Sequence, residues 1–456
     1  MNNYIYVFCL VLLSLSNQSI GISKQLPKEK PNILIILTDD QGYHDVSYYG
    51  TKDIRTPNMD ELCRAGMRFD NFYANSPVCA PTRAALMTGK YPDLVGVPGL
   101  IRSHPEDNWG YLDPKAVTLP QKLKQAGYNT AHIGKWNLGL ESPNLPNEKG
   151  FDLFHGWLED MMDDYNAHTR FGKNYMRLNE KEIDPIGHAT DLFTSWASDY
   201  IISQAKEKEP FFLYLAYNAP HFPVQPPQDW KDRVNNREPN LPEKRANLVA
   251  FIEHLDDGIG KVIKSLKQSG QYENTIIIFS SDNGGHLPDM ANNGALRDGK
   301  QSMYEGGLRV PTFVTWQGKI APGTSSSQDN LSMDIFPTLM ELTGTAITTK
   351  VEGRSFLNTL LGIKNTEEDR ELYFVRREGG LKYGGKAYHA LILGDWKLLQ
   401  NTPTQPMELY NLGIDPEEKI NVIEENQVIF QKLNKILMRH IQEGGAVPWQ
   451  KPMHSY

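Results

Sequence analysis

The chain has 456 residues, of which 39% are hydrophobic and 22% are charged. A compact chain of this length buries roughly three quarters of its unfolded surface, so length and composition exclude disorder, collagen-like repeats and a disulfide-stapled miniprotein. The 47 basic and 55 acidic residues give a net charge of −8. This charge argues against a nucleic-acid-binding protein, and it means that an anionic substrate must be held by a local group of cations.

Residues 1–21 are predicted to be a signal peptide. The first 22 residues contain no Lys, Arg, Asp or Glu, and residues 5–15 form an apolar run of signal-peptide length that is too short to span a bilayer comfortably. Ser19 and Gly21 place small residues at −3 and −1 for cleavage after Gly21. A short membrane anchor is the alternative. We expect export, to the periplasm or the exterior, without stable membrane insertion once the leader is removed.

The first half of the chain predicts a sheet of buried strands. Residues 33–37 are continuous, apolar and rich in β-branched side chains, which is typical of a strand buried on both faces. An apolar segment followed by polar loop residues recurs three times, and amphipathic helical stretches such as 119–126 and 247–266 lie between. The recurrences are at 128–133, 211–217 and 275–279. We therefore expect an α/β fold with a large mixed, mainly parallel sheet sandwiched by helices, and ligands at the carboxyl ends of its strands.

The last third of the chain changes in character. Residues 322–330 are loop-like and precede an apolar helix at 333–343. Beyond about residue 365, the sequence predicts short antiparallel strands, turns with paired glycines (379–380 and 384–385) and a final helix near 427–442. The strands are predicted at 372–376, 388–393 and 396–399. We expect a main domain of residues 31–365 and a small α+β C-terminal subdomain of residues 366–456.

Two pairs of oxygen-bearing side chains follow the first and fourth predicted strands. Asp39 and Asp40 end one strand, and Asp282 and Asn283 end the other. Two adjacent buried carboxylates repel each other strongly unless a cation lies between them. Ligation by oxygen alone favours Ca²⁺ or Mg²⁺ over Zn²⁺. Either pair taken alone is also typical of an ordinary turn after a strand.

Cys79 is predicted to lie at the start of a helix. Pro81 suits the first turn, residues 84–87 are good helix formers, and Gly89 is a typical helix end. Free N–H groups at this position favour anions, and Arg83, one turn on, can point back to the same place. The pattern predicts either a nucleophilic cysteine of low pKa or an inert buried one.

The segment Cys79-Ala80-Pro81-Thr82-Arg83, followed by AALMTGKYP, resembles the Cys-x-Pro-x-Arg signature of the formylglycine-dependent (type I) sulfatases of the alkaline-phosphatase-like superfamily. The resemblance extends from Pro31 to about Asn421. It includes the segments PNILIILTDDQG, TPNMDELCRAGMRF, GYNTAHIGKWNLG, APHFP, SSDNGG, LRDGKQSMYEGGLRVP and ELYNLGIDPEEKIN. It implies an alkaline-phosphatase-like fold whose sulfatase catalytic domain is the main domain, residues 31–365.

The resemblance also implies a mechanism. A maturation enzyme would oxidise Cys79 to formylglycine (3-oxoalanine), whose hydrated gem-diol attacks sulfur with one oxygen and expels sulfate when the other collapses to the aldehyde. One Ca²⁺ per chain would act as Lewis acid and template. Its ligands would be Asp39, Asp40, Asp282, Asn283 and the oxygen derived from Cys79. Arg83 would hold the formylglycine, Lys135 and Lys300 would bind sulfate oxygens, and His221 would protonate the leaving alcohol.

Asn137 departs from the family pattern, which usually has His at this position to assist collapse of the sulfated intermediate. Asn can orient the diol but cannot take a proton near neutral pH. His132 is a poor substitute, because on an extended chain it faces opposite to Lys135 and Asn137. A catalytically weak or silent binder of sulfated glycans is therefore one alternative. A phosphoesterase of the same superfamily is another, disfavoured by Cys79 and by the lack of His among the metal ligands.

The expected substrate is a sulfated poly- or oligosaccharide. Loops 98–111 and 160–173 carry cations beside aromatic residues, which suits an anionic sugar chain, although scattered surface charges would look the same. The candidate substrate-binding residues are Arg102, His168, Arg170, His286 and Arg297. Algal polysaccharides such as ulvan or carrageenan and glycosaminoglycans both stay open, as do the sulfate position, exo or endo action and the oligomeric state.

Overall fold

The computed structural model describes residues 30–363, 369–378 and 387–451. The predicted signal peptide and the two glycine pairs at 379–380 and 384–385 lie outside these residues. In the described part of the chain, no helix combines the length and the apolar character that a membrane span requires.

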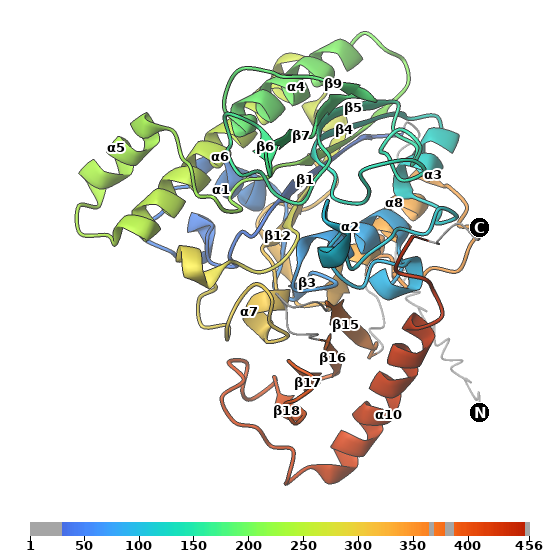
Figure 1. Cartoon of the computed structure of the whole chain (residues 1–456). Coiled ribbons are helices and arrows are strands. Elements are labelled where there is room, and N and C mark those ends of the chain that lie inside the picture. Colours follow the sequence, from blue (N-terminus) through green and yellow to red (C-terminus); the bar gives the residue numbers. More distant parts are fainter. Residues whose placement is uncertain (1–29, 364–368, 379–386, 452–456) are drawn as a thin grey trace, which may run out of the picture.

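The molecule is built on a ten-stranded sheet that runs through the larger body in Figure 1. The four predicted strands form its centre, and they pair in parallel. Antiparallel strands join at both sides, which makes the sheet mixed, as expected. In spatial order the strands are β13 (Thr324–Ser326), β2 (Met67–Phe69), β12 (Thr312–Thr315), β11 (Thr275–Ser281), β1 (Asn32–Thr38), β10 (Phe211–Ala216), β4 (Asn129–Lys135), β5 (Leu153–Trp157), β8 (Met176–Leu178) and β9 (Lys181–Glu182).

Both faces of the sheet are covered by helices. Along β1, Ile33, Ile35 and Leu37 face one core while Leu34 and Ile36 face the other, as the two-residue period of a strand requires. The first core contains residues of α2 (Cys79–Thr88), α3 (Leu119–Gln125), α8 (Ile335–Thr343) and α9 (Leu357–Leu360). The second contains residues of α1 (Pro57–Ala65), α4 (Ala189–Gln204), α5 (Gln228–Arg237) and α6 (Glu243–Gln268). The predicted α/β sandwich is confirmed.

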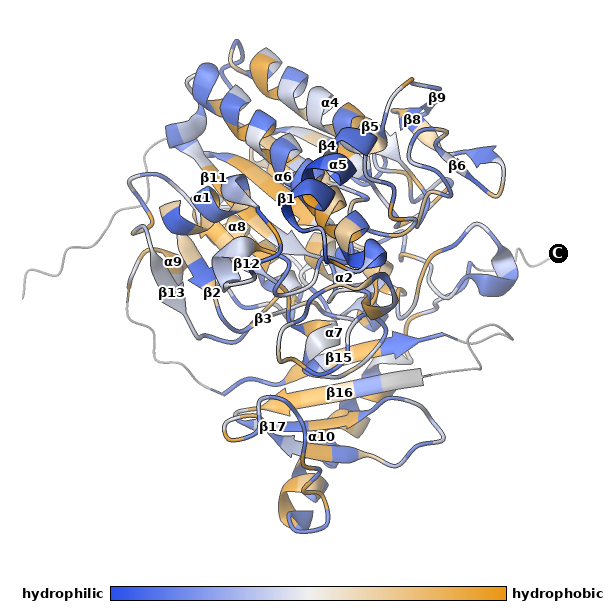
Figure 2. Cartoon of the chain, turned by 90° about the vertical axis from the view of Figure 1, so that its left-hand side faces the viewer, coloured by the Kyte–Doolittle hydropathy of each residue, from blue (hydrophilic) through white to orange (hydrophobic). Residues whose placement is uncertain are grey.

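A four-stranded antiparallel sheet follows, as predicted for the C-terminal part. Its apolar strands lie below the main body in Figure 2, and Leu433 and Leu437 of the final helix are buried against it. The elements are β15 (Leu372–Arg377), β16 (Ala387–Leu393), β17 (Trp396–Gln400), β18 (Glu408–Asn411) and α10 (Gln427–Gly444). The sequence did not predict β18, which is only four residues long and half-exposed at both ends.

Residues 322–330 differ from the predicted loop. Within them, β13 pairs with β2 at the edge of the large sheet, and the short strand β14 (Asn330–Leu331) begins and pairs with β3 (Phe72–Tyr73). The polar sequence Thr-Ser-Ser of β13 gives no hydrophobic signal, because an edge strand can be held by backbone hydrogen bonds alone.

Candidate active site

The carboxyl ends of the central strands bring distant segments together. Asp39 follows β1, Lys135 ends β4, His221 follows β10, and Asp282 follows β11. Because these strands are parallel neighbours, their ends meet at one edge of the sheet, where α/β proteins bind ligands. The predicted catalytic and metal-binding residues therefore form one cluster.

Cys79 opens α2 and lies in the middle of this cluster. Val78 before it is extended, and Gly89 ends the helix in the left-handed region with φ 69°. The Cys79 thiol is 1% exposed and donates to Asp39 Oδ1 at 3.2 Å. Burial and the carboxylates of Asp282 and Asp39 raise the pKa of the Cys79 thiol well above its usual value. The prediction of a low-pKa nucleophilic thiolate is wrong, because these effects outweigh the helix N-terminus.

Arg83 points back from the second turn of α2 to the same cluster. It is fully buried, and its Nε and Nη2 donate to Asp282 Oδ2 at 3.0 and 2.7 Å. Its Nη1 donates to the Lys135 carbonyl at 3.1 Å. The guanidinium thus fixes the end of α2 to the ends of β4 and β11.

Two lysines reach the carboxylates that follow β1. Lys135 Nζ donates to Asp39 Oδ2 at 2.5 Å, and Lys300 Nζ donates to Asp40 Oδ2 at 2.7 Å. Burial alone would raise the pKa of Asp39, but Lys135 and the other cations of the cluster hold it well below its usual range. With Arg83 and Asp282, three cations match three carboxylates.

His221 lies against Lys300. Its Nδ1 is 2.7 Å from the Phe222 carbonyl, and its Nε2 is 2.9 Å from Lys300 Nζ. A carbonyl accepts only, so Nδ1 carries the proton and Nε2 accepts from the ammonium. Burial and Lys300 lower the pKa of His221. Burial alone would lower the pKa of Lys300, but Asp40 and the other carboxylates raise it, so the proton stays on the ammonium and His221 is neutral in this arrangement.

Asn137 occupies the position at which the chain departs from the family pattern. Its φ of 55° is in the left-handed region, which Asn tolerates better than most residues. Its amide donates to the Ile101 carbonyl at 3.0 Å, and its buried Oδ1 has no partner among the described residues. His132 stacks at 4.7 Å on Tyr214, and burial lowers its pKa to about 3, so it is a core residue.

The oxygen donors fit a hard divalent cation. Asn283 Nδ2 donates to Asp40 Oδ1 at 2.7 Å, which leaves the buried Asn283 Oδ1 without a partner among the described residues. Cys79 and His221 lie within 4.8 Å of Asp39 and Asp40, yet they are poor ligands. The thiol is held protonated, and both imidazole nitrogens are already hydrogen bonded. The remaining donors are oxygens of Asp39, Asp40, Asp282 and Asn283, the kind that Ca²⁺ and Mg²⁺ prefer.

The candidate substrate-binding residues lie in different settings. Arg102 and Arg170 both approach Asp160, at 3.6 and 3.7 Å, and His286 Nδ1 is 2.6 Å from Asp289. Arg297 points to the C-terminal sheet, where it donates to the Tyr410 hydroxyl and the Glu418 carbonyl. His168 is buried, and neither of its ring nitrogens has a hydrogen-bond partner among the described residues.

Sequence reasoning missed two residues beside the cluster. Phe222 is 41% exposed and stacks on His221 at 5.0 Å, and Asp160 lies between two arginines. A single Phe or Asp in a loop carries no periodicity, and only the fold brings either to the site.

Comparisons with known proteins show which proteins this chain is similar to. A family model described as Sulfatase matches residues 31–345, and one described as N-sulphoglucosamine sulphohydrolase, C-terminal, matches residues 297–444. N-acetylgalactosamine-6-sulfatase of Canis lupus familiaris is 31% identical over 427 residues, which are 89% of this chain and 78% of the relative. A protein named Sulfatase from Formosa agariphila is 28% identical over 501 residues, 91% of this chain and 89% of its own. The crystal structure of Ps i-CgsB in complex with k-i-k-neocarrahexaose superposes with a TM-score of 0.84 at 30% identity, covering 93% of this chain and 96% of that one.

Proposed function

The chain belongs to the sulfatase family, the type I sulfatases of the alkaline-phosphatase-like superfamily, and is a sulfuric ester hydrolase; we propose that it desulfates a sulfated poly- or oligosaccharide outside the cytoplasm. The observation that carries the proposal is the convergence of three carboxylates and three buried cations on the side chain of Cys79. A sulfate ester is a compact anion, and a site of this kind can hold it and spread its charge.

Cys79 is, on this proposal, converted to formylglycine by a maturation enzyme. The aldehyde hydrate supplies a nucleophilic oxygen and a second oxygen that lets sulfate leave. The setting of Cys79 supports this chemistry, because a buried thiol with a raised pKa is a poor nucleophile as it stands. Asp39, which accepts a hydrogen bond from the Cys79 side chain, is placed to accept one from an oxygen at the same position.

The cations around Cys79 have separable roles. Arg83 orients the residue and keeps Asp282 in place, while Lys135 and Lys300 bind sulfate oxygens. His221 protonates the leaving sugar oxygen, which requires the imidazole first to take up a proton from water at Nε2, the nitrogen that accepts from Lys300 in the structure. Sugar alkoxides are poor leaving groups, so a positioned acid is worth about 10²–10⁴ in rate.

One Ca²⁺ would be held by Asp39, Asp40, Asp282, Asn283 and the oxygen derived from Cys79, and its chemistry would be that of a Lewis acid and template. The three carboxylates are already matched by three cations, so a divalent ion would leave a net charge of +2 to attract the sulfate ester. The same all-oxygen donor set speaks against a two-zinc phosphoesterase.

Export, maturation and domain organisation belong to the same proposal. The leader of residues 1–21 would direct the chain to the periplasm or the exterior, where sulfated polysaccharides occur, with maturation by the formylglycine-generating enzyme before use. Residues 31–365 would form the catalytic domain and residues 366–456 a subdomain that supports it.

A desulfation screen tests the proposal. The protein, co-expressed with a maturation enzyme, is offered an arylsulfate, sulfated algal polysaccharides and glycosaminoglycans, and free sulfate is measured. We expect sulfate release from at least one glycan, lost in Lys135→Ala and retained in Lys419→Ala, an exposed lysine on the C-terminal subdomain. Glycan binding without sulfate release would support the silent-binder alternative, and phosphate release from phosphoesters with no sulfate release would contradict the proposal.

A further inference from the structure

The segments that surround Asn137 form one continuous wall beside the catalytic cluster. Its backbone N–H donates to the Leu158 carbonyl at 3.1 Å, and its side chain donates to the Ile101 carbonyl. Ser103 N donates to Glu159 Oε1 at 2.8 Å, which joins the two segments to each other. Residues 101–103 and 158–160 are therefore fixed directly at the edge of the site.

Asp160 lies close enough to the catalytic cluster for the charges of the cluster to shift its pKa. Burial alone would raise the pKa of Asp160, but Glu159 and nearby cations, Lys135 among them, lower it to about 2. The side chains of Arg102, Asp160 and Arg170 keep 9%, 10% and 10% of their surface exposed, so a small part of each is accessible, whereas Asp160 Oδ1 and Arg170 Nε are buried.

Arg102 of this wall and Arg170, which lies against Asp160 of the wall, are already paired with carboxylates. Arg102 Nε lies 3.6 Å from Asp160, and its Nη2 lies 3.4 Å from Glu378. Arg170 Nη1 lies 2.7 Å from Asp163, and its Nε lies 3.7 Å from Asp160. A further carboxylate or sulfate would find no uncompensated cation here, whereas a hydroxyl group can pair with the exposed atoms of Asp160 and of either arginine.

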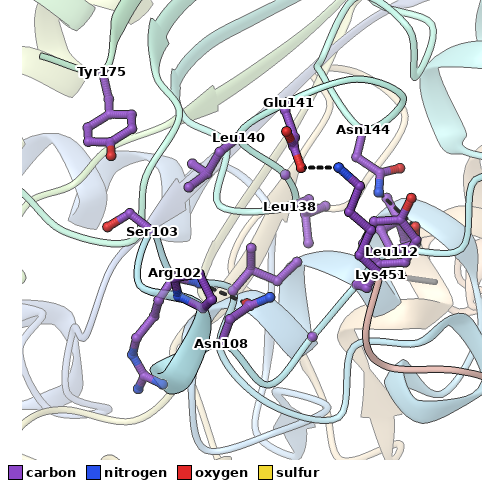
Figure 3. A pocket seen from close by; sticks show the side chains of 15 residues that line it. Arg102, Ser103, Asn108, Leu112, Leu138, Leu140, Glu141, Asn144, Tyr175 and Lys451 are labelled. Atoms are coloured by element: carbon purple, nitrogen blue, oxygen red, sulfur yellow. Dashed lines mark hydrogen bonds and ion pairs between the residues drawn. The ribbon is translucent and has the colours of Figure 1, made fainter. Parts of the chain in front are cut away.

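A cavity of about 390 Å³ adjoins the same wall, within the range of roughly 300–1,000 Å³ typical of small-molecule sites. Leu138, which follows Asn137, and Arg102 both line it. Its other charged lining residues, Glu141 and Lys451, are paired at 2.6 Å (Figure 3). The remaining lining is largely apolar or uncharged and includes Tyr111, Tyr175 and Leu140.

We propose that this cavity and the Arg102–Asp160–Arg170 wall form a sugar-binding subsite that accepts an uncharged ring next to the sulfated one. The substrate class is then a glycan in which the sulfate ester sits beside a neutral hexose or hexosamine unit, without a uronate or a second sulfate on that unit. This inference rests on the proposed function. It replaces the expectation, from residue types alone, that Arg102 and Arg170 bind an anionic neighbour.

Three matched disaccharide substrates test the inference. Each carries one sulfate ester on the same ring, and the neighbouring ring is a neutral hexose, the corresponding uronate or the hexose with a second sulfate. We expect kcat/KM for the neutral neighbour to exceed the other two by about tenfold or more, because their extra charge would lose water without gaining a partner. Equal or higher kcat/KM for the uronate or disulfated substrate would overturn the inference.

Two variants of the cavity wall sharpen the test. Glu141→Gln leaves the Lys451 ammonium without its carboxylate and should raise the uronate-to-neutral ratio of kcat/KM several-fold. Lys451→Met leaves Glu141 unpaired and should lower the same ratio. Glu61→Gln, which breaks an exposed Lys–Glu pair between α1 and α6 (Glu61 to Lys267, 2.8 Å), should leave the ratio unchanged. Identical ratios in both cavity variants and the parent would show that the cavity does not hold the neighbouring ring.

Failure to release sulfate from any glycan or arylsulfate would contradict the proposed function, whereas activity with a uronate preference would contradict the subsite alone.

Discussion

Replacing Lys397 by methionine should destabilise the protein by about 3–5 kcal/mol, the cost of removing one partner from a buried ion pair. Lys397 lies on β17, is 0% exposed, and its Nζ is 2.9 Å from Glu305 Oε1 and 2.8 Å from Glu418 Oε1. The methionine side chain is nearly as long as that of lysine and fills the same space, so the substitution removes the positive charge and little of the packing. Two buried carboxylates then lie close together, and among the described residues Arg309, 2.7 Å from Glu305, is the cation that still pairs with one of them.

The loss can be measured by urea unfolding followed by fluorescence. About 3–5 kcal/mol corresponds to a roughly hundredfold to several-thousandfold shift of the folding equilibrium toward the unfolded state. Lys419→Met is the matched control, because Lys419 pairs with Glu417 at the surface, where 67% and 40% of the side chains are exposed, and such pairs contribute about 0–1 kcal/mol. A second change, Glu418→Gln, should recover part of the loss in the Lys397→Met background. A Lys397→Met variant within about 0.5 kcal/mol of the parent would refute the reasoning.

Three further outcomes are expected. Asn137→His should change kcat by less than about tenfold, since the Asn137 amide is committed to the Ile101 carbonyl; a rise toward the 10²–10⁴ of general-base catalysis, with loss of a product burst, would show that the site lacks its base. Chelation should abolish activity before it unfolds the protein, and added Ca²⁺ should restore it; restoration by Zn²⁺ alone would make the hard-ion assignment wrong. Burial raises the pKa of Asp93 to about 6, although the positive charge of Arg377 acts to lower it. Between about pH 4 and 6 the folded protein therefore binds more protons than the unfolded chain, and its stability falls as the pH rises through this window. Asp93→Asn should flatten that slope in urea titrations at several pH values, and an unchanged slope would exclude Asp93 as its source.

The central strands of the sheet and the polar residues at their carboxyl ends could be predicted from the sequence for the same physical reason. Buried parallel strands are continuous apolar runs, so their ends are visible, and the polar residues at those ends must meet at one edge of the sheet. Each of four residues, Asp39, Lys135, His221 and Asp282, ends or follows a different apolar strand. They are up to 243 positions apart in the sequence.

What the sequence did not reveal depends on partners contributed by distant segments. Arg102 and Arg170 are cations by residue type, but their net contribution to the surface depends on Asp160 and Glu378, which only the fold brings near. The edge strand β13 and the raised pKa of Cys79 could not be predicted either, because the local sequence does not show which backbone a strand pairs with or which side chains become buried.

The most direct test of the account is multiple turnover by the Cys79→Ser variant, compared with the parent after co-expression with a maturation enzyme. Mass spectrometry of the peptide that contains residue 79 establishes which form is present, and sulfate release from an arylsulfate measures turnover. Serine supplies one oxygen where the mechanism needs two on the same carbon, so we predict formylglycine and steady turnover in the parent. The folded variant should show none. Steady turnover by Cys79→Ser, or by parent protein whose Cys79 is entirely unmodified, would contradict the account.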